Sequence, residues 1–278
     1  MKKFSYFYLK TKFQDGLSVE DSIKTKIKEI ENTHGIRTLF ACESGSRAWG
    51  FPSPDSDYDV RFIYIRPREW YLSIQEKPDV LELAVNKLLD INGWDLKKAL
   101  KLLAKHNAVL YEWMQSPIIY AENPLFKTRF IELSNTCFSQ IAAMHHYLSC
   151  AKKYYEVCIE AEMVKLKMYF YCLRSTLAAF WIYHYQTVPP MELQKLLYVI
   201  NDKPRLLDKI LTLVQIKSLQ NESYVHPRQP ELDHFFYEAI TLCESAAPSL
   251  SSAQSDYEVF NTFFQEMIIG EKDEFARP

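Results

Sequence analysis

Glycine is scarce in this chain: it supplies 6 of 278 residues, and only Gly270 lies beyond residue 120. A Walker-type phosphate loop needs the spacing Gly-x-x-x-x-Gly-Lys, which does not occur. The sequence therefore excludes a P-loop enzyme. A long segment almost free of glycine is typical of helices, because glycine destabilises helix interiors.

Paired cysteines are also missing, since no two of the six cysteines form a Cys-x-x-Cys motif. His145-His146 and Cys150 have no second Cys or His pair at the spacing of a structural zinc site. Four of the cysteines fall in the predicted helical middle of the chain, where a buried free thiol is the ordinary state. We therefore expect a reducing, cytoplasmic setting.

Long apolar runs and a strong net charge are absent as well. Residues 1–10 are too short and too polar for a signal peptide or a membrane span, so we expect a soluble protein without membrane contact. The net charge of −2 gives no general basic surface for nucleic acid, although it leaves room for a local basic groove. No internal repeat occurs, and the sequence leaves the oligomeric state open.

Hydrophobic periodicity divides the chain into two parts. In the first part it predicts helices at 18–33, 68–73, 95–106 and 108–115 and strands at 38–42, 59–65, 79–85 and 87–91, with Gly93 breaking the chain. In the second part it predicts helices at 124–138, 139–160, 163–186, 190–200, 203–219 and 231–246. We expect an α+β protein in which a mixed-sheet catalytic domain (1–120) precedes an all-helical domain (121–278).

The most informative segment is Cys42–Arg61. Gly45-Ser46 follows one apolar run, and Asp57-Tyr-Asp59 opens the next. Side chains two apart on a strand share a face, so the two carboxylates repel each other unless a cation lies between them. Mg²⁺ suits such oxygen ligands, and two ions can clamp the attacking and leaving oxygens of an in-line displacement.

The Gly-Ser pair suits an anion. Gly45 lets the backbone approach a phosphate, the Ser46 hydroxyl and nearby N–H groups can bind its oxygens, and Arg47 adds charge. The alternative is that the Asp-rich stretch after Pro52 and Pro54 is a solvated turn, since Asp, Ser and Pro are common turn residues.

These residues resemble the signature of the DNA polymerase β-like nucleotidyltransferase superfamily. Within it, the chain is similar to a family named for an RNA repair pathway, through the segments 43–51, 53–64, 69–72, 89–100, 112–117 and 147–153. The resemblance implies a polymerase β-like catalytic domain with a helical lobe that covers the triphosphate. It also implies that Gly45 and Ser46 bind a nucleoside triphosphate, while Asp57 and Asp59 bind two Mg²⁺ ions, with Mn²⁺ as an alternative metal.

A third carboxylate is usual in such sites. Asp90 is the first candidate for a metal ligand and base, because a carboxylate in the apolar run 88–92 is expensive to bury unpaired. Glu82, in another predicted strand, is the second candidate. Asp95 is explained better as a helix cap.

Lys167, Tyr171 and Arg174 follow helical spacing and share one face, from which they can reach the triphosphate; Lys152 on the preceding helix can join them. The equally weighted alternative is a solvated helix face with extended Lys stems.

The first functional hypothesis is a nucleotidyltransferase that moves a nucleoside monophosphate from a nucleoside triphosphate to an acceptor hydroxyl and releases pyrophosphate. The resemblance points to an RNA end, such as that of a tRNA, as acceptor. A second hypothesis keeps this chemistry but adenylylates a protein or a small molecule. A third is a nucleotide-binding module without catalysis.

Overall fold

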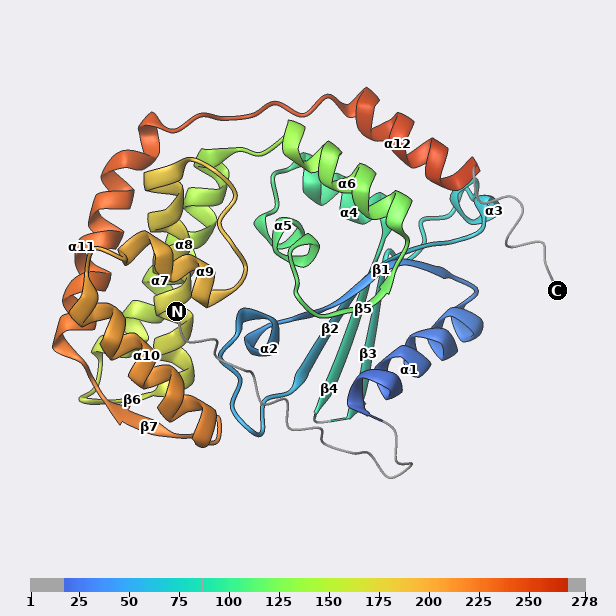
Figure 1. Ribbon diagram of the computed structural model, residues 1–278. Helices are drawn as coiled ribbons and strands as arrows, with labels where there is room; N and C mark the ends of the chain where they lie inside the picture. Colours follow the sequence, from blue (N-terminus) through green and yellow to red (C-terminus); the bar gives the residue numbers. More distant parts are fainter. Residues whose placement is uncertain (1–17, 87, 270–278) are drawn as a thin grey trace.

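The computed structural model describes residues 18–86 and 88–269 (Figure 1). Residues 1–10, in which the sequence predicted no signal peptide, lie outside the described residues, and so does Gly270. A sheet flanked by helices forms one part of the molecule, and a group of helices forms the other (Figure 1). The predicted α+β class, with a mixed sheet followed by a helical part, is confirmed.

The main sheet has five strands in the order β3-β4-β2-β1-β5. Strands β2 and β4 are parallel, and the other neighbours are antiparallel. The strands are β1 (Arg37–Ser44), β2 (Tyr58–Ile65), β3 (Val80–Asn86), β4 (Leu89–Asp95) and β5 (Ile119–Glu122). The sequence did not predict β5, which is only four residues long.

Helices cover both faces of this sheet (Figure 1). Helix α1 begins after the Ser18 cap, ends at Gly35, and packs with Val60, Phe62 and Tyr64 on one face. The opposite face, with Ile63, packs against α4, α5, α6 and α12. The helices of this part are α1 (Val19–His34), α2 (Ser46–Trp49), α3 (Arg68–Tyr71), α4 (Leu96–Ala104), α5 (Ala108–Met114), α6 (Pro124–Thr136) and α12 (Tyr257–Ile269).

The helical lobe has its own core, formed mainly by α7, α8, α10 and α11. The helix predicted at 163–186 begins later than expected, because residues 163–165 form a strand that pairs with residues 225–227. The elements of the lobe are α7 (Gln140–Ile159), β6 (Met163–Lys165), α8 (Leu166–Tyr185), α9 (Leu193–Leu196), η1 (Leu197–Ile200), α10 (Pro204–Leu219), β7 (Val225–Pro227), α11 (Pro230–Ala246) and η2 (Ala247–Ser249).

The two cores do not divide at residue 120, where the sequence placed a domain boundary. Phe126 and Phe130 of α6 pack in the core of the sheet, together with Phe260 and Phe263 of α12. The chain therefore leaves the sheet only after α6 and returns to it after α11, as the red segment in Figure 1 shows.

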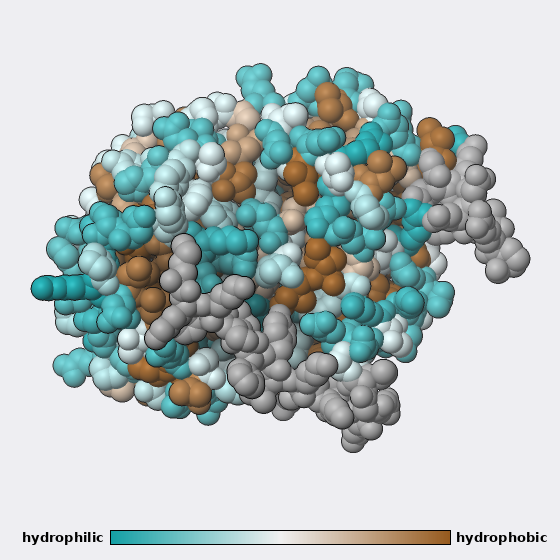
Figure 2. Space-filling model, viewed as in Figure 1, coloured by the Kyte–Doolittle hydropathy of each residue, from teal (hydrophilic) through white to brown (hydrophobic). Residues whose placement is uncertain are grey.

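No helix in the described ranges is long and apolar enough to cross a membrane. On the face seen in Figure 2, hydrophobic side chains are scattered among hydrophilic ones.

Gly93 does not break the chain as predicted. Strand β4 continues through it to Asp95, whose side chain then caps α4. The Phe62 ring lies directly over Gly93, and a Cβ at this position would lie 2.1 Å from Phe62 Cζ. This glycine is needed for the packing of neighbouring strands and not for a turn.

We expect Gly93→Ala to lower the free energy of unfolding by about 1–3 kcal/mol, the usual cost of overpacking a core. Chemical denaturation measures this change. In a Phe62→Leu background the same substitution should cost clearly less, because the ring that opposes the new methyl group is gone. An equal cost in both backgrounds would contradict the assigned contact.

Candidate active site

Gly45 lies directly against Asp59. Strand β1 ends opposite the start of β2, where Ser44 pairs with Asp59. At Gly45 the chain turns into α2 with φ = 83°, a left-handed conformation that favours glycine. A Cβ at Gly45 would lie 2.2 Å from Asp59 Oδ2. The turn and the carboxylate therefore need a residue without a side chain at this position.

Asp59 and Asp90 lie side by side on the parallel strands β2 and β4, where they are partners in register. Arg61 joins them: its Nη2 lies 3.1 Å from Asp59 Oδ1 and 2.8 Å from Asp90 Oδ2. The alternative third acid, Glu82, is exposed on β3 and pairs with Asn92. The structure thus brings Asp90, and not Glu82, next to Asp59.

The carboxyl group of Asp59 has a raised pKa. Its pKa is raised to about 6, chiefly because burial disfavours the charged form; the neighbouring acids Asp57 and Asp90 raise it further, whereas Arg61 lowers it. Within residues 18–86 and 88–269, no group of three or more His, Cys, Asp or Glu side chains is gathered closely enough to hold a metal. Asp59 and Asp90 share an arginine instead.

Glu43 supports Asp59 from the other side of the strand. It is fully buried, and its Oε1 accepts the Asp59 N–H at 2.9 Å while its Oε2 accepts the Tyr120 hydroxyl at 2.6 Å. Burial raises the pKa of Glu43 to about 7, although both hydrogen bonds oppose this rise. The sequence reasoning gave Glu43 no role; the signal was an acid inside an apolar strand, which requires partners.

The Arg47 guanidinium group, which the sequence predicted to add charge beside a phosphate, is hydrogen-bonded to the backbone of the loop before β2. Its Nε donates to the Asp57 carbonyl at 3.0 Å, its Nη2 donates to the Ser56 carbonyl, and the group lies 3.9 Å from the centre of the Tyr58 ring. Arg47 therefore holds the backbone that carries Asp57.

Ser46 belongs to a chain of hydrogen bonds that crosses to the helical lobe. The Ser46 hydroxyl donates to Ser56 Oγ at 3.1 Å, and Ser56 Oγ donates to Glu222 Oε1 at 2.8 Å. Lys167 donates to the other oxygen of Glu222. The backbone N–H of Glu222 donates to Asp55 Oδ1 at 2.9 Å, which anchors this loop on the catalytic part.

The sequence reasoning missed Ser56 and Glu222. The β6–β7 ribbon explains their proximity to Lys167, because Lys165 pairs with Val225 and so places the preceding loop beside the start of α8. Burial would raise the pKa of Glu222, but hydrogen bonds from Lys167 and Ser56 outweigh it and hold the pKa below its usual value.

Lys217 is a second cation that the sequence reasoning missed. It is 2 % exposed, and its Nζ donates to Ser53 Oγ at 2.9 Å. Burial lowers its pKa to about 8, although the charge of Glu222 opposes this shift. Lys217 thus fixes α10 to the loop that leads to the acids.

The predicted stripe on α8 does not act as one unit. Lys167 reaches the loop of the acids through Glu222, which also accepts a hydrogen bond from Ser56, the residue before Asp57. Tyr171 is half-buried beside it, with its ring edge-on to Trp49 at 5.5 Å. These two side chains lie where the helical lobe contacts α2 and the Ser56 loop.

Arg174 is not positioned as the predicted stripe required, because it is buried in an ion pair. It is only 5 % exposed, and its Nη2 lies 3.0 Å from Glu112 Oε1 while its Nε donates to the Met191 carbonyl. Tyr147 donates to the same Glu112 oxygen at 2.7 Å. With the Trp49 ring 4.4 Å away, Arg174 is buried where the two cores meet and is paired with Glu112.

Lys152 does not join Lys167 as predicted. It pairs with Glu244 of α11, which lies on the outer side of α7 and α8 (Figure 1). Lys152 therefore points away from the sheet and its acids.

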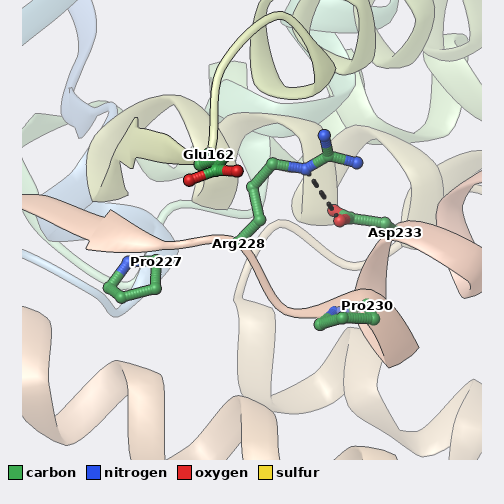
Figure 3. A pocket seen from close by; sticks show the side chains of 5 residues that line it. All are labelled: Glu162, Pro227, Arg228, Pro230 and Asp233. Carbon is green, nitrogen blue, oxygen red and sulfur yellow. Dashed lines mark hydrogen bonds and ion pairs between the residues drawn. The ribbon is translucent and has the colours of Figure 1, made fainter.

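A pocket beside the β6–β7 ribbon contains none of the predicted site residues (Figure 3). The Arg228 Nε lies 2.9 Å from Asp233 Oδ2, and Tyr169 donates to the other oxygen of Asp233. Arg228 and Asp233 already have partners within the protein, so their ion pair accounts for these polar groups in the lining of the pocket.

Comparisons with known proteins find relatives of this chain. A sequence profile of the RNA repair pathway DNA polymerase beta family matches residues 19–266. The uncharacterized protein YcgL of Bacillus subtilis (strain 168) is 38 % identical over 238 residues, which are 86 % of this chain and 92 % of that protein. A crystal structure of a nucleotidyltransferase-like protein from Exiguobacterium sibiricum aligns with 91 % of this chain and 81 % of its own, at 13 % identity and a TM-score of 0.29.

We expect Arg174→Ala to destabilise the protein by about 3–5 kcal/mol, because it leaves the buried Glu112 carboxylate without its cation. Urea unfolding measures the loss. Lys152→Ala, which breaks an exposed pair, should change stability by less than about 1 kcal/mol. If both variants unfold like the wild type, the buried pair does not join the two cores.

Proposed function

The chain belongs to the RNA repair pathway DNA polymerase beta family, and we propose that it transfers a nucleoside monophosphate from a nucleoside triphosphate to a terminal hydroxyl of an RNA, such as a tRNA end. Membership of this family makes the protein a nucleotidyltransferase. The RNA acceptor is taken from the family's description, since the net charge of −2 offers no support from a general basic surface.

The observation that carries the proposal is the position of Asp59 on β2 against the Gly45 turn, with Asp57 just before the strand. Ser56, which precedes Asp57, shares the Glu222 carboxylate with Lys167. Carboxylate oxygens are the ligands that Mg²⁺ prefers, with Mn²⁺ as an alternative. The Asp59 carboxylate can lie against this turn because Gly45 has no Cβ. Asp57 and Asp59 would hold the divalent ion, which when bound supplies positive charge for the triphosphate oxygens.

The remaining residues of the site bind the acceptor and the triphosphate and orient them for the reaction. The acceptor oxygen forms a bond to the α-phosphorus, the bond from that phosphorus to the bridging oxygen breaks, and pyrophosphate leaves. The side chain of Asp90 is 53 % exposed beside Asp59, so an acceptor hydroxyl can approach it from solvent and lose its proton to it. Lys167 then stabilises the negative charge that gathers on the leaving pyrophosphate.

The triphosphate would accept hydrogen bonds from the same donors that now bind the Glu222 carboxylate. Lys167 and the Ser56 hydroxyl both donate to this carboxylate, and Ser46 donates to Ser56. Phosphate oxygens accept the same hydrogen bonds as carboxylate oxygens. We infer that nucleotide entry displaces the Glu222 carboxylate, after which Ser46, Ser56 and Lys167 contact the phosphates.

The acceptor is tested by incubating the protein with each α-labelled nucleoside triphosphate, Mg²⁺, and either an RNA with a free 3′ hydroxyl or a protein mixture. Label in the RNA supports the proposal. Label only in protein would support the alternative of protein adenylylation, and no covalent label with any acceptor would favour a module that only binds nucleotides.

Asp57→Asn and Asp59→Asn should each abolish transfer and leave the fold intact, because each removes a metal-binding charge at constant volume. Labelled-nucleotide transfer and circular dichroism provide the two measurements. A variant that folds and keeps near wild-type transfer would rule out the assigned carboxylate pair.

Lys167→Ala should reduce kcat by about tenfold to a thousandfold, the range for one lost donor that stabilises transition-state charge. Tyr171→Phe should have a smaller effect, since a neutral hydroxyl contributes less than a cation. Lys152→Ala is the matched control, because that lysine faces α11, and its kinetics should equal those of the wild type. Equal losses at Lys152 and Lys167 would contradict a specific role for Lys167.

A further inference from the structure

Arg61 occupies the space between the second and third carboxylates. It lies two residues after Asp59 on β2 and therefore shares its face. Its Nη2 contacts one oxygen of Asp59 and one of Asp90, at 3.1 and 2.8 Å. Its Nη1 donates to the carbonyls of Val60 at 3.0 Å and Asp90 at 3.3 Å. The guanidinium group is thus held by both strands at four oxygen atoms.

The strand register explains why a cation is needed here. Because β2 and β4 are parallel and Asp59 pairs with Asp90, two carboxylates are fixed on adjacent strands. Like charges on neighbouring strands destabilise a sheet unless an opposite charge lies between them. The planar fork of an arginine can bind two acceptors at once, and its charge is permanent.

The same position is where a divalent ion shared by these two acids would have to lie. Mg²⁺ requires its oxygen ligands at about 2.0–2.1 Å in a nearly octahedral arrangement. The Arg61 Nη2 already lies between the two oxygens, and a divalent ion placed there would be repelled by the guanidinium charge. Asp57 has no such contact with an arginine side chain among the described residues, so the Asp57–Asp59 side remains open to a metal.

We propose that Arg61 is a built-in substitute for a second metal ion, so that the protein loads one divalent ion, on Asp57 and Asp59, together with its nucleotide. Arg61 then fixes Asp59 as a metal ligand and orients Asp90 toward the acceptor hydroxyl. This inference rests on the proposed nucleotidyl transfer, and it replaces the expectation from the sequence that Asp90 is a ligand of a two-ion site.

The test counts Mn²⁺ ions by electron paramagnetic resonance, with an excess of an α,β-methylene triphosphate analogue whose α–β bridge cannot be broken. The wild type should bind one ion per chain. Arg61→Gln should bind two, because the space between Asp59 and Asp90 becomes free. Adding Asp90→Asn to Arg61→Gln should return the count to one.

Asp90→Asn in the otherwise wild-type chain keeps the test informative if Arg61→Gln does not fold. Because Asp90 is not a metal ligand in this proposal, its replacement should leave the count at one and the Mn²⁺ affinity within about twofold. Arg68→Gln, an exposed arginine on α3 at the other end of β2, is the matched control and should behave like the wild type.

Two bound ions in the wild type, or a single ion in folded Arg61→Gln, would overturn the role of Arg61. If the wild type binds two ions and still transfers label to an acceptor, this inference fails while the proposed function stands. If it transfers no label to any acceptor, the proposed function fails, and the role of Arg61 in it fails too.

Discussion

The position of the candidate site depends on how β1 and β2 pair at their ends. Ser44 opposes Asp59, so the turn that follows β1 must pass directly beside a carboxylate, and only a glycine with a left-handed backbone fits there. From the opposite face of the sheet, the buried Glu43 accepts the Asp59 N–H. The first residues of β2 are therefore fixed from two sides, and the parallel register with β4 then sets where Asp90 lies. The geometry of the acids follows from strand register, which needs no ligand to form it.

The helical lobe is held against this part by polar contacts that water does not reach. The Arg174–Glu112 pair and the Lys217–Ser53 hydrogen bond are both buried, and they join α-helices of the lobe to α5 and to the loop before β2. Buried ion pairs often add little net stability relative to apolar contacts, yet breaking one is costly. Such contacts tolerate few alternative orientations of the lobe. They therefore hold Lys167 opposite the acids.

The sequence alone predicted those features that depend on residues close together in the chain. Alternating and helical patterns predicted most elements, and the spacing of Asp57 and Asp59 predicted that the two acids meet at the start of a strand; in the structure Asp59 lies on β2, whereas Asp57 precedes it. Helical spacing also placed Lys167 and Arg174 on one face of α8, but it could not tell that this face is half-buried at one end and covered by Trp49 at the other. Glu222 and Arg61 were missed because their partners are distant in the sequence or on a neighbouring strand. The three-residue strands β6 and β7 were too short to show a period.

The protein supplies internal counter-charges on both sides of its candidate site. Arg61 pairs with both Asp59 and Asp90, and Glu222 pairs with Lys167. In the proposed function, nucleotide binding is an exchange of ion partners, in which the gain from a new contact is reduced by the loss of an old one. Glu222 is tethered beside its donors by the Asp55 contact, so it competes at a high effective concentration. A single phosphate group offers little advantage over such a carboxylate. A triphosphate that also reaches the Asp57–Asp59 pair through a divalent ion gains contacts that Glu222 cannot make. The arrangement thus favours long polyphosphates over small anions.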